Sequence, residues 1–474
     1  MILRLVIPLG LSVLLGVSIT TWLWRRGSRS VPLAVLVASL AVGLGFGLSS
    51  GSAFLSLVLF DGIGRGLVVT DLACLGGLGA FALVHAARGR LREAAPVVDS
   101  PARRSAVTPV LAVAFGVSLV AVVVRFGQMS VTYPHGWWDA WMIYNLRARF
   151  LLRGGGEWAD AFSALLPISH PDYPLLLPAL VVRAWSYVGQ ETTIVPQLMA
   201  LGFTLATVGV LWAGLALLRD PDQGLLAGAM LLTVPLFVGT AVVQEADTPL
   251  GFYFLATIVL LALHDRRVSA SPPSRGCLLL AGLAAGLAAW TKNEGVLFLI
   301  AIVAVRFAVE ARAQGWRRPA REAAIFGLGA LPIVLVLVYF KIQLAPANDL
   351  VVGQGLRETS ARLLEVRRYG MIFDTLRETI LNSGPMGVVS AIWVLAIHAV
   401  AFGFDTEHPS GRVAVTALTA VGLMMAGYVM AYLTSPHDLQ SHLDSSLTRL
   451  LAQVWPTALF GYFLVARTPR EARA

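Results

Sequence analysis

The sequence predicts an all-α polytopic membrane protein with about thirteen transmembrane helices and with interfacial helices in its large extracytoplasmic loops. The first observation is composition. The 474 residues are 57% hydrophobic and 13% charged, and the mean hydropathy of +0.74 exceeds what a soluble protein needs for its core. Secondly, apolar runs close to the roughly 20 residues that cross a bilayer recur along the chain. Thirdly, arginine-rich segments separate these runs on alternate sides.

Thirteen apolar runs are the predicted spans. They cover residues 1–24, 31–50, 66–86, 107–126, 194–218, 223–243, 249–264, 276–290, 295–309, 324–341, 385–403, 412–433 and 448–466. The first run also resembles a secretory signal, because Arg4 precedes its apolar core. We interpret it as a retained helix with an outer N-terminus, because it is long, lacks a small-residue cleavage site and is followed by the arginines of RRGSRS.

The basic loops define the predicted cytoplasmic face. The net charge is +9 and the pI is near 10, but the arginines flank apolar runs instead of forming one basic surface, which argues against a nucleic-acid partner. These loops read RRGSRS, RGRLREAAPVVDSPARR, RDPDQG, HDRRVSASPPSRG, ARAQGWRRPAR and, at the C-terminus, RTPREARA. The two cysteines, Cys74 and Cys277, lie far apart and indicate neither a disulfide framework nor a thiolate metal site.

The opposite, outer face receives two long connections, residues 127–193 and 342–384. The alternation of sides holds only if 174–189 does not cross, so we expect a helix that lies at the outer surface or dips inward. Residues 355–380 carry apolar side chains at helical spacing with arginines between them, which predicts an interfacial amphipathic helix.

Asp139 is the first polar residue of interest on this face, within the segment GWWDAWMIYN. One interpretation is an anchor at the interface, in which the tryptophans form an aromatic belt and Asp139 is solvated or caps the next helix. The other is a general base, partly desolvated by the tryptophans, that accepts a proton from an attacking hydroxyl.

Four further polar groups face the same side. SHPDYPLLLP holds His170 and Asp172 on a proline-fixed backbone, either to orient a substrate or simply as a turn that opens a helix. QEADTPLGFY places Glu245 and Asp247 between two spans, where Asp247 either caps a helix or converges with Glu245 on a sugar or cation. The remaining residues are Lys292 and Glu294, in a turn expected to line a cavity, and Arg449, which either binds a lipid phosphate or extends to headgroups.

In this order along a polytopic chain, these motifs resemble the GT-C superfamily of membrane glycosyltransferases, which includes protein O-mannosyltransferases and the lipid A aminoarabinose transferase. WWDAWMIYN is similar to the first acidic motif of the family, and EADTPL is similar to the second. HPDYPLLLP is similar to a His-Pro-Pro-Leu stretch, with Asp172 in place of the second proline. TKNEGVL is similar to a Thr-Lys-Gly turn, with Asn293 in place of the glycine. The stretch from Arg449 to Pro456 resembles a late loop of bacterial relatives.

The resemblance implies a catalytic module at residues 107–466, preceded by three additional helices and a cytoplasmic linker at 1–106 and followed by a cytoplasmic tail at 467–474. It implies transfer of a sugar from a polyprenyl-phosphate donor to a lipid, glycan or protein hydroxyl, with inversion and with Asp139 as the general base. Lys292 and Arg449 would hold the departing phosphate, while Glu245, Asp247 and His170 would bind sugar or acceptor, or a divalent ion. No cofactor is assigned, because the spacing of the acids does not form an obvious ligand set.

The expected location is the inner membrane of a bacterial cell, with the site facing the periplasm or exterior. The main alternative is a transporter or flippase of lipid-linked saccharides that uses the same acids as a proton relay or sugar site. Clustering of the charges in outer turns favours the enzyme. A non-catalytic assembly subunit is the second alternative.

Overall fold

A computed structural model describes residues 2–21, 30–87, 107–270, 275–348, 355–384, 389–405, 410–468 and 471. Within these ranges the chain is helical, and its only β-pairing is an isolated bridge between Phe404 and Ala466. The cytoplasmic linker predicted at 88–106, most of RRGSRS and the last residues of the tail lie outside the described residues. The all-α class predicted from the sequence is confirmed.

Six described helices are long and apolar enough to cross a membrane, and a bent pair makes a seventh span if it crosses as one. The polytopic class is thereby confirmed, whereas thirteen crossings remain a prediction, because several predicted spans form shorter helices. The six are α2 (Val31–Phe60), α4 (Thr108–Thr132), α7 (Ile194–Leu218), α10 (Asp247–Ala270), α13 (Arg317–Gln343) and α17 (Gly411–Thr434).

The other α-helices fill the space between these spans. They are α1 (Ile2–Thr21), α3 (Arg65–Ala87), α5 (Asn145–Arg153), α6 (Leu176–Val188), α8 (Pro221–Thr233), α9 (Pro235–Val242), α11 (Arg275–Thr291), α12 (Asn293–Gln314), α14 (Leu356–Leu364), α15 (Val366–Asn382), α16 (Ala391–Phe402) and α18 (Leu439–Val465).

The predicted span at 223–243 is a bent pair, α8 and α9, which meet at 63°. Pro235 causes the break, because a proline lacks a backbone donor and disfavours the helical conformation of the residue before it. Val234 accordingly has extended angles, with φ −84° and ψ 117°.

Two predictions near the C-terminus differ from the structure. The segment 434–449 was expected to be mostly loop, yet α18 already begins at Leu439, where Asp438 caps it by accepting a hydrogen bond from the Ser441 amide. In the predicted span at 385–403, the described part, residues 389–403, contains one helix, the twelve-residue α16. The amphipathic segment 355–380 is helical as expected, but it breaks at Glu365 into α14 and α15.

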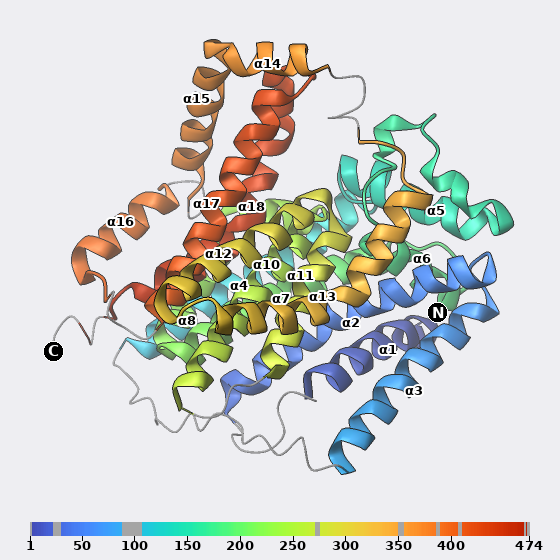
Figure 1. Cartoon of the computed structure of the whole chain (residues 1–474), viewed down its shortest axis with the longest axis horizontal. Helices are drawn as coiled ribbons and strands as arrows, with labels where there is room; N and C mark the ends of the chain where they lie inside the picture. Colours follow the sequence, from blue (N-terminus) through green and yellow to red (C-terminus); the bar gives the residue numbers. More distant parts are fainter. Residues whose placement is uncertain are drawn as a thin grey trace.

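α10 forms the centre of the molecule, because every residue of its apolar window is buried, whereas the corresponding window of α4 is only 11% buried and faces outward. α7, α11 and α18 surround α10 (Figure 1). α1–α3 lie at one end of the view, far from α14–α16 at the other. α6 has thirteen residues, too few to span a bilayer, and it is buried against α1, α2 and α5.

Candidate active site

The stretch that carries Asp139 is shaped by a glycine and a π-helix. Gly136 has φ +77°, and a Cβ there would lie 2.5 Å from the Cβ of Ala140 and 2.6 Å from the carbonyl oxygen of Val243. Only glycine lets the chain pass this close to the turn after α9. Residues Ala140–Tyr144 then form a π-helix, closed by the amide of Asn145 donating to the carbonyl of Ala140. Such bulges are frequent at functional sites.

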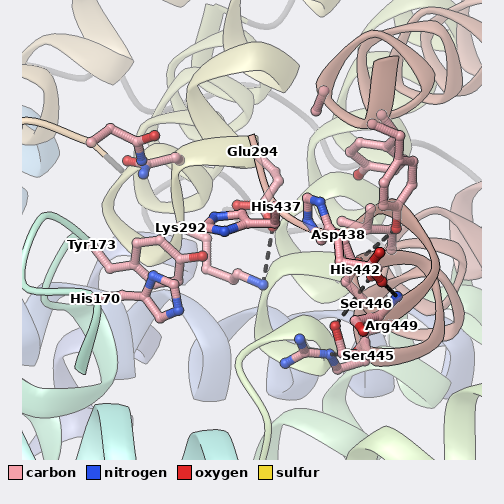
Figure 2. A pocket seen from close by; sticks show the side chains of 17 residues that line it. His170, Tyr173, Lys292, Glu294, His437, Asp438, His442, Ser445, Ser446 and Arg449 are labelled. Atoms are coloured by element: carbon pink, nitrogen blue, oxygen red, sulfur yellow. Dashed lines mark hydrogen bonds and ion pairs between the residues drawn. The ribbon is translucent and has the colours of Figure 1, made fainter. Parts of the chain in front are cut away.

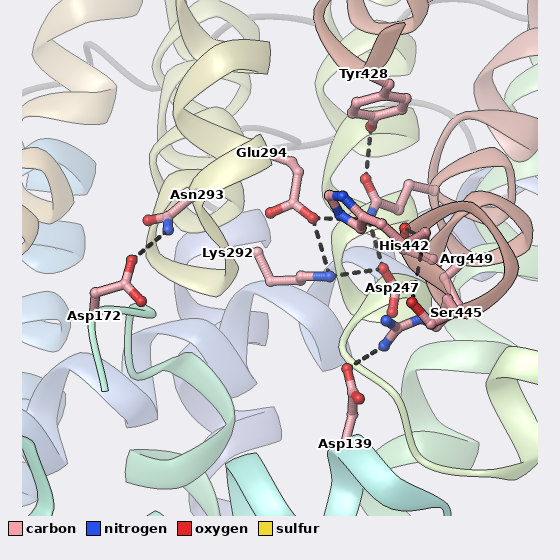
Figure 3. Close-up of polar contacts among 12 residues, drawn as sticks. Asp139, Asp172, Asp247, Lys292, Asn293, Glu294, Tyr428, His442, Ser445 and Arg449 are labelled. Atoms are coloured by element: carbon pink, nitrogen blue, oxygen red, sulfur yellow. Dashed lines mark hydrogen bonds and ion pairs between the residues drawn. The ribbon is translucent and has the colours of Figure 1, made fainter. Parts of the chain in front are cut away.

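Asp139 directs its side chain toward α18, where it forms an ion pair with the guanidinium of Arg449 (Figure 3). The two side chains are 13% and 21% exposed, respectively. Asp139 makes no capping hydrogen bond to the helix that follows it. The structure thus brings together two residues that are 310 positions apart in the sequence, and the interpretation of Asp139 as a cap or a solvated anchor does not describe its contacts.

The loop with His170 and Asp172 lies on the other side of the site. Asp172 is 3% exposed, and its carboxylate accepts hydrogen bonds from Asn293 at 2.8 Å and Asn348 at 2.7 Å. Lys341 donates to the backbone carbonyl of Asp172. His170 stacks on Tyr173 with ring centroids 4.6 Å apart. Asp172 therefore fixes the loop, and His170 is the member of the motif that faces the cavity described below.

Asp247 and Lys292 form a buried ion pair between these two regions, with 3.0 Å from Nζ to Oδ1. Glu294 accepts from the same ammonium at 3.0 Å, and Gln453 donates to Asp247. Asp247 does not cap α10 with its side chain but begins the helix and points into this cluster (Figure 3). Burial lowers the pKa of Lys292, but the carboxylates of Asp247 and Glu294 more than offset it and raise this pKa well above its usual value. Lys292 therefore remains a cation.

Glu245 differs from its neighbours because its carboxyl group forms no salt bridge with any cation among the described residues. Burial, followed by the charge of Asp247, raises the pKa of Glu245 to about 8. Glu245 is only 6% exposed. At neutral pH this side chain is mainly a protonated acid that can donate a hydrogen bond, whereas the carboxylates beside Lys292 accept.

Two cavities meet at Arg449. The first, of about 450 Å³, is lined by imidazole, hydroxyl, amide and charged groups (Figure 2). The second, of about 600 Å³, is lined by three aromatic rings that follow α4, by apolar and polar side chains of α4, α9 and α18, and by Asp139 and Glu245. We call them the polar cavity and the tryptophan cavity. The lining of the polar cavity includes His170, Tyr173, Lys292, Glu294, Tyr428, His437, His442, Ser445 and Arg449, and that of the tryptophan cavity Arg125, Tyr133, Trp137, Trp138, Asp139, Glu245 and Arg449.

All eight residues predicted from the sequence thus lie in one polar region. Lys292, Glu294, His170 and Arg449 line the polar cavity, while Asp139 and Glu245 line the tryptophan cavity. Asp247 is buried behind the first group and Asp172 beside it. Sequence reasoning missed a second set of polar residues that contact these eight or line the polar cavity with them: Lys341, Asn348, Tyr428, His437, His442 and Gln453. Gln453 had a detectable signal, because it follows Arg449 by one helical turn.

Among the described residues, no group of three or more His, Cys, Asp or Glu side chains is arranged to hold a metal ion. The carboxylates of the site instead accept hydrogen bonds from ammonium, guanidinium and amide groups. What this arrangement can do chemically is to accept a proton at Asp139, hold an anion at Arg449 and Lys292, and hydrogen-bond a polyhydroxyl ligand.

Comparison with known proteins gives one family. Residues 169–340 match the dolichyl-phosphate-mannose-protein mannosyltransferase family. The match covers less than half of the chain and supports a place in the GT-C superfamily. It likewise supports a membrane glycosyltransferase of the GT-C type that uses a lipid-linked sugar donor. No protein with a curated description and no solved structure matches the chain.

The matched segment runs from the His170 loop to Phe340, so it includes Asp172, Glu245, Asp247 and Lys292. Asp139 and Arg449 lie outside it, one on either side. Their roles are therefore argued from their geometry, not from the match.

Proposed function

We propose that this enzyme transfers a sugar from a polyprenyl-phosphate donor to an acceptor hydroxyl on the outer side of the membrane, with inversion of the anomeric centre and with Asp139 as the general base. One observation carries the proposal. The carboxylate of Asp139 is paired with Arg449 at the junction of two cavities, one lined by imidazole, hydroxyl, amide and charged groups and one that adds three aromatic rings and apolar side chains to its polar lining.

An inverting displacement needs the attacking hydroxyl and the departing phosphate on opposite faces of the anomeric carbon. In the structure the carboxylate of Asp139 lines the tryptophan cavity, the ammonium of Lys292 lines the polar cavity, and Arg449 lies between them. The acceptor oxygen forms the new bond to the anomeric carbon while the bond from that carbon to the phosphate oxygen breaks. The hydroxyl proton passes to Asp139, and the polyprenyl phosphate leaves as an anion.

The two cations suit a phosphate. The guanidinium of Arg449 offers a bidentate fork, and Lys292 is a point charge held at 3.0 Å from each of two carboxylates. Because they are positioned before the leaving group acquires charge, they stabilise the transition state with little reorganisation. A donor phosphate competes with Asp139 for Arg449, so binding of the donor releases the carboxylate to act as a base.

Neutral polar groups around the polar cavity are proposed to bind the sugar or the acceptor. His170, together with the imidazoles and hydroxyls of the first turns of α18, faces this cavity (Figure 2). Glu245, mainly protonated at neutral pH, offers a donor hydrogen bond from the opposite cavity. The proposal assigns no step to a metal ion.

The lipid chain of a substrate needs a lateral route into the site. The tryptophan cavity is bordered by Arg125 and Met129 of α4, the helix whose apolar surface is the most exposed of the candidate spans. Trp137 and Trp138 are about half exposed, as expected for rings at a membrane interface. We propose that this cavity opens toward the bilayer and that residues 107–466 form the catalytic module in an inner membrane.

The test uses purified protein in lipid nanodiscs, a panel of radiolabelled polyprenyl-phosphate sugars and membrane extract as the source of acceptor. Wild type is compared with Asp139→Asn and with the matched control Asp160→Asn, which makes the same chemical change at an exposed position of the same outer loop. We expect wild type and control to form labelled product and Asp139→Asn to be slower by at least about a hundredfold, the usual effect of removing a general base.

Equal rates for Asp139→Asn and wild type would remove the base assignment. Movement of intact labelled donor across the bilayer of proteoliposomes without product would instead establish a transporter. The stereochemistry of the product, read by NMR, tests inversion independently of the variants.

A further inference from the structure

α2 lies directly behind the active site, although it precedes both the family-matched segment and the first acidic motif. It packs against α6, α7, α10 and α11 (Figure 1). α6 follows the His170 loop and α11 ends at the turn that carries Lys292; we call these two segments the site's turns. Ser50 and Phe54 lie one turn apart on one face of α2, and both are at most 1% exposed.

Ser50 connects two turns of the site through its hydroxyl. The indole Nε1 of Trp290 donates to the Ser50 oxygen at 3.0 Å, and the hydroxyl donates in turn to the carbonyl of Leu175 at 3.4 Å. Trp290 stands two residues before Lys292, and Leu175 stands three residues after Asp172. A single side chain of α2 thus contacts the indole of Trp290, two residues before the cation, and the backbone carbonyl of Leu175, just after the His170 loop.

Phe54 supports a third site residue. Its ring makes edge contacts with Trp290, at 5.2 Å between centroids, and with Phe340, at 6.4 Å. Phe340 directly precedes Lys341, which donates to the carbonyl of Asp172 and, at 2.8 Å, to the side-chain oxygen of Asn293. Trp290 and Phe340 also contact each other at 5.8 Å. Phe54 of α2 therefore packs against aromatic rings that stand close in sequence to both Lys292 and Lys341.

We propose that α2 positions the active site: the Ser50 hydroxyl sets the spacing between the Lys292 turn and the His170 loop, so sugar transfer depends on a helix outside the family-matched segment. The inference rests on the proposed function, in which Lys292 holds the donor phosphate. Misplacement of a binding group by about 1 Å reduces rates by up to about a hundredfold, so the loss of one bridging hydroxyl is expected to slow transfer measurably.

Ser49 supplies the matched control. It is adjacent on the same helix, it is fully buried, and its hydroxyl also makes one side-chain hydrogen bond, at 2.8 Å to Ser12 of α1. That bond joins α1 to α2 and contacts no site residue. Ser49→Ala and Ser50→Ala thus remove equivalent groups from the same helix, and only the second removes a contact to the site's turns.

The experiment measures steady-state transfer by both variants, in the full-length protein in nanodiscs, together with their unfolding temperatures. We expect Ser50→Ala to lower kcat about tenfold with an unfolding temperature close to that of Ser49→Ala, and Ser49→Ala to keep the wild-type kcat. Combining Ser50→Ala with Trp290→Phe should lower kcat by less than the product of the two single effects, because both changes interrupt the same hydrogen bond between Trp290 and Ser50.

Hydrogen–deuterium exchange gives a readout that does not need activity. Ser50→Ala should raise exchange in the backbone around residues 172–175 and 290–294, whereas Ser49→Ala should not. Equal effects of the two variants on kcat and on exchange would overturn the inference. Failure of the proposed function is recognised separately, as full activity of Asp139→Asn or as absence of product with the wild type, and it leaves the exchange comparison of the two serines unaffected.

Discussion

The buried ion pair between Asp71 of α3 and Arg183 of α6 provides a stability prediction of defined size. Both side chains are 1% exposed and 2.8 Å apart. Asp71 also accepts from Ser52 at 2.6 Å and from Tyr187 at 2.8 Å, and Arg183 donates to the carbonyl of Pro8 at 2.9 Å. Asp71→Asn removes the charge that compensates this guanidinium and should reduce the free energy of unfolding by about 3–5 kcal/mol, because a buried charge is left unpaired.

The assay is unfolding by SDS titration in mixed micelles, followed by tryptophan fluorescence. A surface pair serves as the control: Glu191 bonds Arg153, whose side chain is 68% exposed, so Glu191→Gln should cost at most about 1 kcal/mol. Removing both charges with Asp71→Leu and Arg183→Met should restore part of the stability that Asp71→Leu loses, since no charge then remains unpaired. A loss below 1 kcal/mol for Asp71→Asn would refute the argument that this pair is desolvated in the folded protein.

Two further predictions concern the charges of the site. Lys292→Met should abolish transfer and destabilise the fold, because Asp247 and Glu294 lose their shared cation. Lys292→Arg should lower the unfolding temperature less than Lys292→Met does, but should still lose most of the activity. Thermal unfolding and product formation, measured on the same samples, separate the two effects. Glu245 should make stability depend on pH: the folded protein keeps its proton up to a pKa of about 8, whereas the unfolded chain releases it near the usual value for Glu. The stabilisation is therefore complete below that usual value and is lost as the pH rises toward 8. Glu245→Gln should remove this dependence between pH 5 and 8, and an unchanged pH profile in that variant would contradict the buried, protonated state.

The fold class was predictable because bilayer physics leaves few solutions for long apolar runs. The side assigned to each loop rests on arginine placement and stays a prediction. The ends of the helices near the site could not be predicted from the sequence. Proline at 235 was visible in the sequence, but the bend depends on what packs around α8 and α9. Nothing local indicated that α18 would begin at Leu439, because serines and histidines suit a polar loop equally well.

The charged residues of the candidate site could be selected from the sequence. Which of them form ion pairs with one another could not. Asp139, Lys292 and Arg449 stand out because charges are expensive in an apolar chain. Which cation meets which carboxylate depends on contacts across hundreds of residues, and a sequence pattern contains no such information. Lys341 illustrates the limit: it ends a predicted span, where a lysine is ordinarily an interfacial anchor, yet it binds the carbonyl of Asp172.

The π-helix at Ala140–Tyr144 makes the length of this segment as important as its chemistry. Each residue of an α-helix advances the side-chain direction by about 100°. Loss of one residue here would relax the π-turn into an ordinary α-turn. The direction of the Asp139 side chain relative to Arg147 would then change by about 100°. Arg147 itself is held in place by its hydrogen bond to the carbonyl of Tyr173. Substitutions in this stretch should therefore be tolerated more readily than insertions or deletions. A sequence alignment with a gap between residues 139 and 147 would place Asp139, which faces Arg449, opposite an acid of the other protein that points elsewhere.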